Sequence, residues 1–107
     1  MRVHVGRAGG PSVGEYAADD RVRRTASVLS QEIFDEAVLL DTSGGLYFGV
    51  NPTGRLLWSA IVEATPLAEL ARLLVTCFGI SEEQAWGDVR RFVGELERHG
   101  LVEILAP

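Results

Sequence analysis

Short runs of apolar residues in the middle of the chain predict β-strands. Residues 37–40 and 46–50 are two such runs, and the residues between them are all polar or glycine, which is typical of a tight hairpin turn. A less regular apolar stretch, residues 28–34, predicts a short strand before them. Along the last run, alternation places one set of side chains toward the core, Leu46, Phe48 and Val50, and the other set outward, Tyr47 and Gly49.

The second half of the chain changes to helical periodicity. Apolar residues recur every three or four positions in residues 52–63, in residues 67–78 and from residue 82 to the stop at Gly100, which predicts three helices. The third of these puts Ala85, Val89, Phe92 and Leu96 on one core stripe, with Trp86 and Val93 beside it. Helix caps are expected at Asn51-Pro52, at Thr65-Pro66, at the Ser81–Gln84 capping box and at Gly79.

Strands followed by helices predict an α+β domain of winged helix-turn-helix type. It would consist of a three-stranded antiparallel sheet followed by three helices, each layer covering the apolar face of the other. We expect this domain to span residues 26–107, and we expect residues 1–25, which begin rich in glycine and alanine, to form a flexible N-terminal tail. The trio Val3-His4-Val5 leaves two interpretations open: a solvated tail, or a segment that pairs with an open strand edge of its own chain or of a neighbour.

Length and composition fit one globular domain. The chain has 107 residues, of which 47% are hydrophobic and 23% are charged, so one core can form and wholesale disorder is not indicated. No apolar run approaches the roughly 18 residues that span a bilayer, and the start of the chain lacks the apolar segment of a signal peptide. We therefore expect a cytoplasmic protein.

Side chains that carry catalysis or bind metals are few and scattered. Cys77 is the only cysteine, and together with His4 and His99 it forms no recognised metal-ligand spacing. All ten basic residues are arginine, so a phosphate-binding loop with its lysine is absent. The serines have no histidine near them in a recognised nucleophile motif. We expect no enzyme activity, no cofactor and no metal.

The predicted fold is also used by DNA-binding regulators, which place their last helix in the major groove. Here that helix carries three arginines against five acidic residues, and the whole chain has a net charge of −5. Such a surface repels phosphate groups. A winged-helix DNA-binding regulator therefore remains an alternative by fold analogy alone.

An open sheet edge is the feature that favours peptide binding. If only three strands form, an outer strand keeps unpaired backbone groups, and an extended peptide can add to it as a further strand. Side chains beside that edge would give selectivity, although the apolar ones, taken singly, are more typical of a core. The candidate peptide-binding residues are Leu46, Tyr47, Phe48, Gly49, Val50, Trp86, Arg90, Val93 and Glu97.

Three segments, in this order, resemble the PqqD-like family, the small leader-binding domains also called RiPP recognition elements. They are AVLLD at residues 37–41, LYFGVNPTG at residues 46–54 after a glycine turn, and GLVE at residues 100–103. The resemblance spans residues 27–103. The most similar members are the stand-alone proteins of lasso-peptide biosynthesis.

The resemblance implies a non-catalytic recognition protein without a cofactor. It would bind the leader segment of a ribosomally made precursor peptide as an added antiparallel strand against residues 46–50, in a cleft with the third helix. It would then deliver the peptide to a separate protease or cyclising enzyme. A structural docking subunit of a larger peptide-modifying enzyme is a further alternative, and a homodimer through a sheet edge or the N-terminal tail is also left open.

Overall fold

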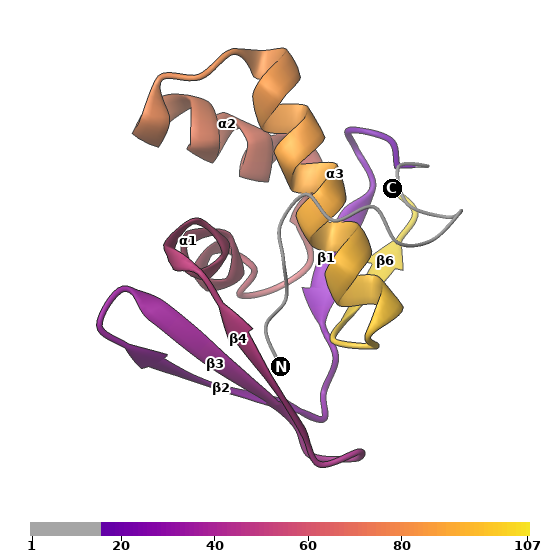
Figure 1. Cartoon of the computed structure of the whole chain (residues 1–107). Helices are drawn as coiled ribbons and strands as arrows, with labels where there is room; N and C mark the ends of the chain where they lie inside the picture. The colour runs from indigo at the N-terminus through magenta and orange to yellow at the C-terminus, as the bar shows by residue number, and fades with distance from the viewer. Residues whose placement is uncertain (1–15) are drawn as a thin grey trace.

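A computed structural model describes residues 16–107, and it shows two small sheets packed with three helices (Figure 1). Each sheet has three antiparallel strands, in the orders β5-β1-β6 and β2-β3-β4. The predicted α+β class is therefore confirmed, and the winged helix-turn-helix type stays a prediction. In chain order the elements are β1 (Arg21–Arg24), β2 (Val28–Ile33), β3 (Glu36–Asp41), β4 (Leu46–Val50), α1 (Pro52–Ala60), β5 (Thr65–Pro66), α2 (Leu67–Phe78), α3 (Glu82–Arg98) and β6 (Val102–Leu105).

The predicted hairpin of β3 and β4 is confirmed. Leu39 lies opposite Phe48 in this pair, and both side chains are buried. The turn closes where the N–H of Gly45 donates to the carbonyl oxygen of Asp41 at 2.7 Å. Gly45 has a φ of 71°, a backbone conformation that glycine adopts without strain. The hairpin therefore follows from residues that are close together in the sequence.

Two of the three helix starts follow the predicted caps. The side-chain oxygen of Asn51 accepts the N–H of Gly54 at 2.8 Å at the start of α1. The hydroxyl of Ser81 accepts the N–H of Gln84 at 3.1 Å at the start of α3. The third prediction is wrong, because Thr65–Pro66 forms the short strand β5 and α2 begins after it without a side-chain cap. Antiparallel pairing with β1 holds these two residues extended.

The helix ends are partly as expected. Gly79 ends α2 in the left-handed conformation, with a φ of 66°, which confirms the predicted C-terminal glycine. α1 is shorter than residues 52–63, because it ends at Ala60. The N–H of Ile61 donates to the carbonyl oxygen of Trp58 at 3.1 Å, and this tighter turn leads the chain away toward β5.

The domain begins earlier than the sequence predicts. Arg21–Arg24, which we expected in the flexible tail of residues 1–25, forms β1 at the centre of the second sheet. Its one apolar side chain, Val22, is fully buried. This strand is stabilised by pairing with β5 and β6, which lie far along the chain, so no pattern in the neighbouring sequence predicts it. Residues 1–15, with the trio at residues 3–5, lie outside the described residues.

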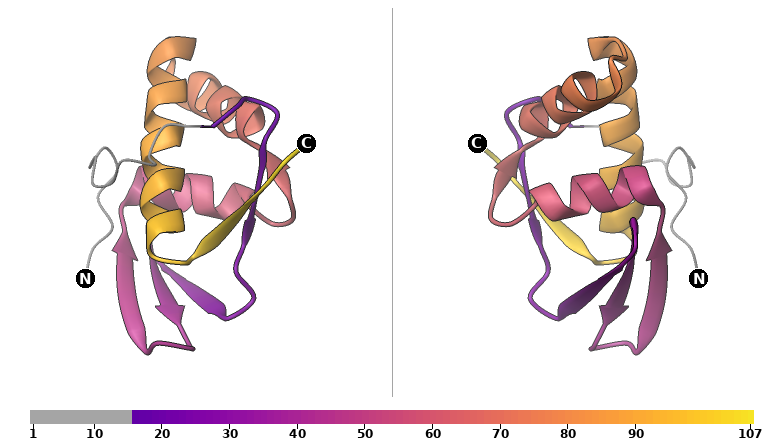
Figure 2. Two further views of the ribbon diagram at one scale, coloured as in Figure 1. Left: turned by 90° about the vertical axis from the view of Figure 1, so that its right-hand side faces the viewer. Right: turned by 90° about the vertical axis from the view of Figure 1, so that its left-hand side faces the viewer.

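All three helices lie on one face of the sheet β2-β3-β4 (Figure 2). The core between these layers contains Trp58, Phe48 and Phe92 as its largest fully buried side chains. No helix in the described part of the chain covers the opposite face of this sheet. The predicted core stripe of α3 is confirmed, since four of its residues are fully buried: Ala85, Val89, Phe92 and Leu96.

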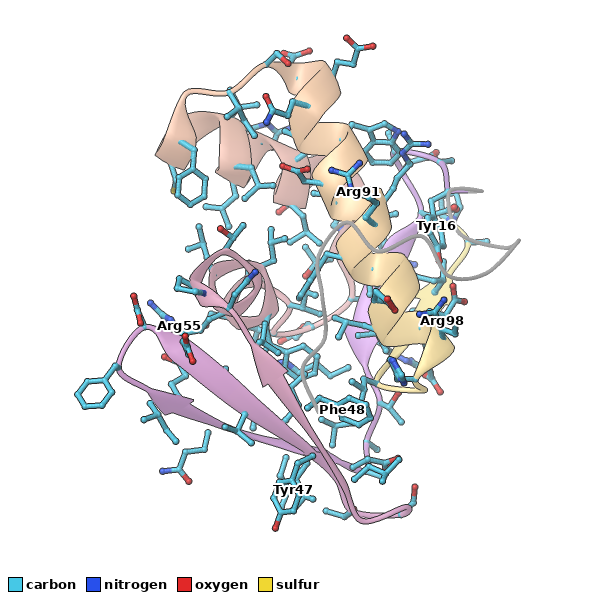
Figure 3. All side chains as sticks on the ribbon, in the orientation of Figure 1. Tyr16, Tyr47, Phe48, Arg55, Arg91 and Arg98 are labelled. Atoms are coloured by element: carbon cyan, nitrogen blue, oxygen red, sulfur yellow. The ribbon has the colours of Figure 1, made fainter. Side chains whose placement is uncertain are left out.

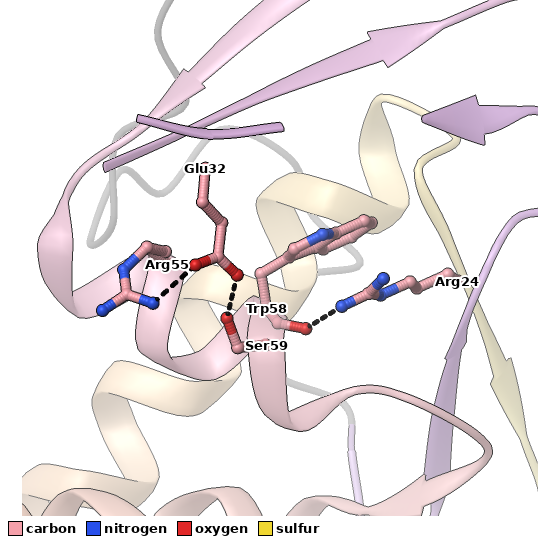
Figure 4. A network of polar contacts seen from close by, with 5 residues as sticks. All are labelled: Arg24, Glu32, Arg55, Trp58 and Ser59. Carbon is pink, nitrogen blue, oxygen red and sulfur yellow. Dashed lines mark hydrogen bonds and ion pairs between the residues drawn. The ribbon is translucent and has the colours of Figure 1, made fainter. Parts of the chain in front are cut away.

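A polar network joins α1 to both sheets (Figure 4). The carboxylate of Glu32 on β2 accepts hydrogen bonds from Arg55 and Ser59 of α1, each at 2.9 Å. On the other side of the helix, the guanidinium of Arg24 on β1 lies 4.5 Å from the ring centre of Trp58 and donates to the Trp58 carbonyl oxygen at 2.6 Å. These contacts hold α1 between the sheets, and they thereby hold β4, which leads directly into α1.

Candidate functional site

β4 is an edge strand. It pairs with β3 on one side, and no other strand of residues 16–107 pairs with it on the other side. The N–H of Thr42, just after β3, donates to the carbonyl oxygen of Ser27, just before β2, so the backbone groups of Thr42 face β2. Backbone groups alternate in direction along a strand, so those of the preceding residue, Asp41, face β4. By the same alternation along β4, the N–H and C=O groups of Tyr47 and Gly49 point away from the sheet. The backbone groups of these two residues are therefore available to hydrogen-bond a further strand along this edge.

The side chains of β4 alternate between core and surface. Phe48 and Val50 are each 1% exposed, as expected for the core side. Leu46 was also expected to face the core, but its side chain is 51% exposed because it begins the strand next to the turn. Tyr47 is 61% exposed on the opposite face, and Gly49 places no side chain beside it. The edge is therefore anchored by two buried residues and carries two exposed ones.

The C-terminal half of α3 lies near this edge. The rings of Phe48 on β4 and His99 at the end of α3 are 4.8 Å apart between centroids. Figure 3 shows Arg91 and Arg98 on the front of α3, and the two views of Figure 2 place β4 on that same front side of the molecule. One flank of α3 and the open edge of β4 therefore border the same region.

This flank of α3 carries two ion pairs. Arg91 pairs with Asp88, and Arg98 pairs with Glu95, in each case three residues apart along the helix. The Glu95 carboxylate is almost fully buried, and its Oε2 lies 2.8 Å from the Arg98 guanidinium. Arg91 remains 41% exposed, and its surface pair contributes at most about 1 kcal/mol. A carboxylate of a bound molecule can therefore compete for Arg91.

The structure does not bring the predicted helix residues beside β4. Glu97 accepts a hydrogen bond of 2.5 Å from the hydroxyl of Tyr16, which Figure 3 shows on the far side of α3 from β4. Trp86 lines a hollow together with Ala18 and residues of α2. Val93 is fully buried in the core. The predicted helix residues are spaced three or four positions apart, so they share one flank of α3, which we call the second flank: Trp86, Arg90, Val93 and Glu97.

Residues 16–20 already cover part of the second flank. Burial raises the pKa of Tyr16, and the hydrogen bond to Glu97 raises it further, so the hydroxyl keeps its proton and donates to Glu97 up to a higher pH than an ordinary tyrosine would. The N–H of Ala68 donates to the carbonyl oxygen of Ala18 at 3.0 Å, which ties the segment to α2. The hollow of about 480 Å³ beside it is lined by Ala18, Ala68, Ala71, Arg72, Val75, Glu82, Glu83 and Trp86.

The charged flank near β4 was not among the candidates predicted from the sequence. Acid and arginine three residues apart are visible in the sequence, where they indicate surface ion pairs. The two flanks beside a core stripe are equivalent in spacing, however, and only the position of the neighbouring strand distinguishes them. The residues of this flank that were not among the candidates predicted from the sequence are Asp88, Arg91, Glu95, Arg98 and His99.

The described residues offer binding groups of a simple kind. No three His, Cys, Asp or Glu side chains of residues 16–107 come together as metal ligands. The same part of the chain contains no helix that is long and apolar enough to cross a membrane. Cys77 is an exposed free thiol on α2. The region between β4 and α3 brings together backbone donors and acceptors, apolar side chains and two arginines.

Solved structures share this fold. TbiB1 in complex with the TbiA(beta) leader peptide matches with a TM-score of 0.72 and 28% sequence identity, covering 76% of this chain and 94% of that one. Lasso peptide synthetase B1 complexed with the leader peptide matches with a TM-score of 0.69 and 22% identity, covering 77% and 96% of the two chains. The second likeness concerns the fold alone. Among curated proteins, no sequence match was found.

A family model adds evidence from the sequence. The model of coenzyme PQQ synthesis protein D (PqqD) matches residues 36–102. This range runs from the start of β3 to the first residue of β6, so it contains both the β4 edge and α3. The resemblance stated from the sequence segments is confirmed. The chain belongs to the PqqD family.

Proposed function

We propose that this chain binds the leader segment of a ribosomally made precursor peptide as an added antiparallel strand on β4, in a pathway of the lasso-peptide kind. One observation carries the proposal: the backbone groups of Tyr47 and Gly49 point outward along an open strand edge. TbiB1, which is 28% identical, supports it because that protein is in complex with a leader peptide. The chain itself performs no catalytic step in this proposal and uses no cofactor.

Main-chain pairing gives affinity with little sequence preference. Two outward-facing residues supply about four hydrogen-bonding groups, and each hydrogen bond contributes about 0.5–1.5 kcal/mol net. Selectivity among leaders then has to come from side chains beside the edge. We assign this role to Leu46 and Tyr47 on β4 and to Arg91, Arg98 and His99 on the nearby flank of α3. The residues of the second flank contribute less in this arrangement.

Holding the leader raises the local concentration of the attached core segment near an enzyme that has little affinity for it alone. We infer that this enzyme is a separate leader peptidase or cyclising enzyme. The cytoplasm is the compartment for this role, since ribosomally made precursors are released there.

A proline in the open edge tests strand addition. Gly49→Pro removes an N–H that faces outward and leaves the bonds between β3 and β4 in place, and edge strands tolerate proline. We expect it to weaken leader binding about tenfold, which corresponds to about 1.4 kcal/mol. Gly49→Ala keeps the N–H, and we expect its affinity to stay within about threefold of wild type. Fluorescence polarisation of a labelled leader encoded beside this gene measures both, and circular dichroism checks folding.

Two results would count against the proposal in different ways. Equal leader affinities of the two Gly49 variants, with both proteins folded, would contradict strand addition at this edge. A folded wild-type protein that binds none of the neighbouring precursor leaders would contradict the leader-binding function itself.

A further inference from the structure

The outward face of the sheet β2-β3-β4 is apolar and uncovered by any helix of residues 16–107 (Figure 2). Leu29, Leu40 and Tyr47 lie opposite one another across the three strands. Leu29 is 60% exposed and Tyr47 is 61% exposed. The solvent face of an antiparallel sheet is usually polar, so a row of exposed apolar side chains here indicates a contact surface.

A hollow of about 480 Å³ lies on this face, and we call the hollow and its rim the outer face. Its lining contains no acidic residue and no arginine, so an apolar partner can cover it without burying an unpaired charge. Ile33, at the end of β2, adds a side chain that is 48% exposed. The lining residues are Leu29, Ser30, Gln31, Ile33, Val38, Leu40 and Tyr47.

The turn between β2 and β3 adds a strained, exposed aromatic side chain to this hairpin. Phe34 has a φ of 59°, the only positive φ of a non-glycine residue among residues 16–107. Its side chain is 97% exposed. Glycine suits this backbone conformation, and a bulky residue is disfavoured there. In the free protein the strained backbone at Phe34 lowers the stability of the fold, and the exposed ring makes no contact that would compensate. This combination points to a contact of Phe34 with a partner.

We propose that the outer face, with Phe34 as its anchor, docks the enzyme that processes the leader-bound precursor. This inference rests on the proposed function. A leader strand added to β4 extends the same sheet, so every second leader side chain lies on the outward side next to Tyr47. A protein that covers the outer face therefore touches this chain and the leader together. Docking then depends on whether the leader is bound.

The extent of the outer face favours such a partner over a second copy of the chain. Stable protein interfaces involve about 20–30 residues a side. The lining of the hollow and Phe34 supply far fewer. A symmetric pair of free chains would have only these residues to bury, whereas the leader strand provides further contacts to an enzyme that binds across both.

Substitutions at exposed positions can separate docking from leader binding. Phe34→Gly removes the anchor and suits the positive φ, so the variant should be at least as stable as wild type. Leu29→Thr removes an apolar side chain and keeps the preference for a strand. Phe78→Ser is the matched control, because Phe78 is an exposed aromatic at the end of α2, and α1 lies between α2 and the sheet β2-β3-β4 (Figure 1). Each variant is tested for binding of the labelled leader and for leader cleavage by the purified peptidase encoded beside this gene.

We expect Phe34→Gly and Leu29→Thr to bind the leader within about twofold of wild type, as surface substitutions do. Cleavage at limiting peptidase should slow at least about tenfold, as expected for truncation of an interface anchor. Phe78→Ser should match wild type in both assays.

Four results would overturn the inference. Unchanged cleavage with both sheet variants would remove the docking role and leave leader binding intact. Loss of leader affinity in these variants would assign the outer face to the leader itself. A wild-type dimer in light scattering that Phe34→Gly converts to a monomer would assign the face to a second copy. A wild type that binds no leader would overturn the proposed function, and this inference with it.

Discussion

At the scale of single residues, Gly54 shows how a small side chain positions the open edge. It lies in the first turn of α1, and its N–H donates to the cap residue Asn51. A Cβ at this position would lie 2.3 Å from Cγ1 of Val50 and 2.9 Å from Cε1 of Phe92. Glycine therefore lets α1 begin directly at the end of β4 while packing against α3.

Replacement of this glycine tests the close approach. We expect Gly54→Ala to lower the free energy of unfolding by about 1–3 kcal/mol, as overpacking does, despite the better helix propensity of alanine. Gly87→Ala is the matched helical control, because a Cβ there meets only Nη1 of Arg91 at 3.4 Å, the end of a flexible side chain. It should raise stability by up to about 1 kcal/mol. Urea unfolding measures both, and equal changes would show that the contact at Gly54 has no effect.

At the scale of elements, α3 has two flanks with different neighbours. One flank meets β4 through the contact of His99 with Phe48. The other meets the segment before β1 through the hydrogen bond between Tyr16 and Glu97. The core stripe between the flanks is buried, so a peptide on β4 can reach only the first one without displacing part of the domain.

Two adjacent arginines of α3 distinguish the flanks. Arg91 lies on the side of β4, whereas Arg90 lies 6.0 Å from the Trp86 ring on the other side. Arg91→Ala should weaken leader binding by about three- to tenfold, because a charge-assisted contact is lost. Arg90→Ala should leave the affinity within about twofold of wild type. Fluorescence polarisation measures both, and the opposite order of effects would return the site to the flank first predicted from the sequence.

Elements whose signals are local could be predicted, and those that depend on distant partners could not. The turn at Gly45 and the caps at Asn51 and Ser81 depend on residues within four positions. The second sheet depends on contacts such as that of Arg23 with Glu103, which are 80 positions apart. The candidate site likewise has one part that could be predicted from the sequence and one part that could not. Alternation along β4 predicts its buried side, but the flank of α3 that faces β4 is decided by tertiary packing.

At the scale of the whole molecule, the second sheet joins the two ends of the described residues. β1 lies between β5 and β6, and Arg23 pairs with Glu103 at 2.8 Å. The N–H of Thr25 donates to the carbonyl oxygen of Leu101 at 3.0 Å. In this sheet β6 pairs only with β1, so the last strand depends on β1. This places residues 21–24 within the folded domain.

Truncation tests that boundary. Removal of residues 1–25 deletes β1, and we expect it to lower the free energy of unfolding by more than about 2 kcal/mol, because the buried side chain of Val22 is lost with the strand. Removal of residues 1–15 is the matched control, and it should change stability by less than about 0.5 kcal/mol. Urea unfolding followed by circular dichroism measures both. Equal stability of the two truncated chains would exclude β1 from the stable domain.

An unpaired strand edge can also recruit further copies of the same protein, and repeated recruitment leads to aggregation. Two properties oppose this here. β4 is only five residues long, and its outward-facing backbone groups belong to Tyr47 and Gly49, so a second copy would gain few hydrogen bonds. The net charge of −5 also makes the copies repel one another. The protein can therefore keep an edge open for one peptide and still resist polymerisation.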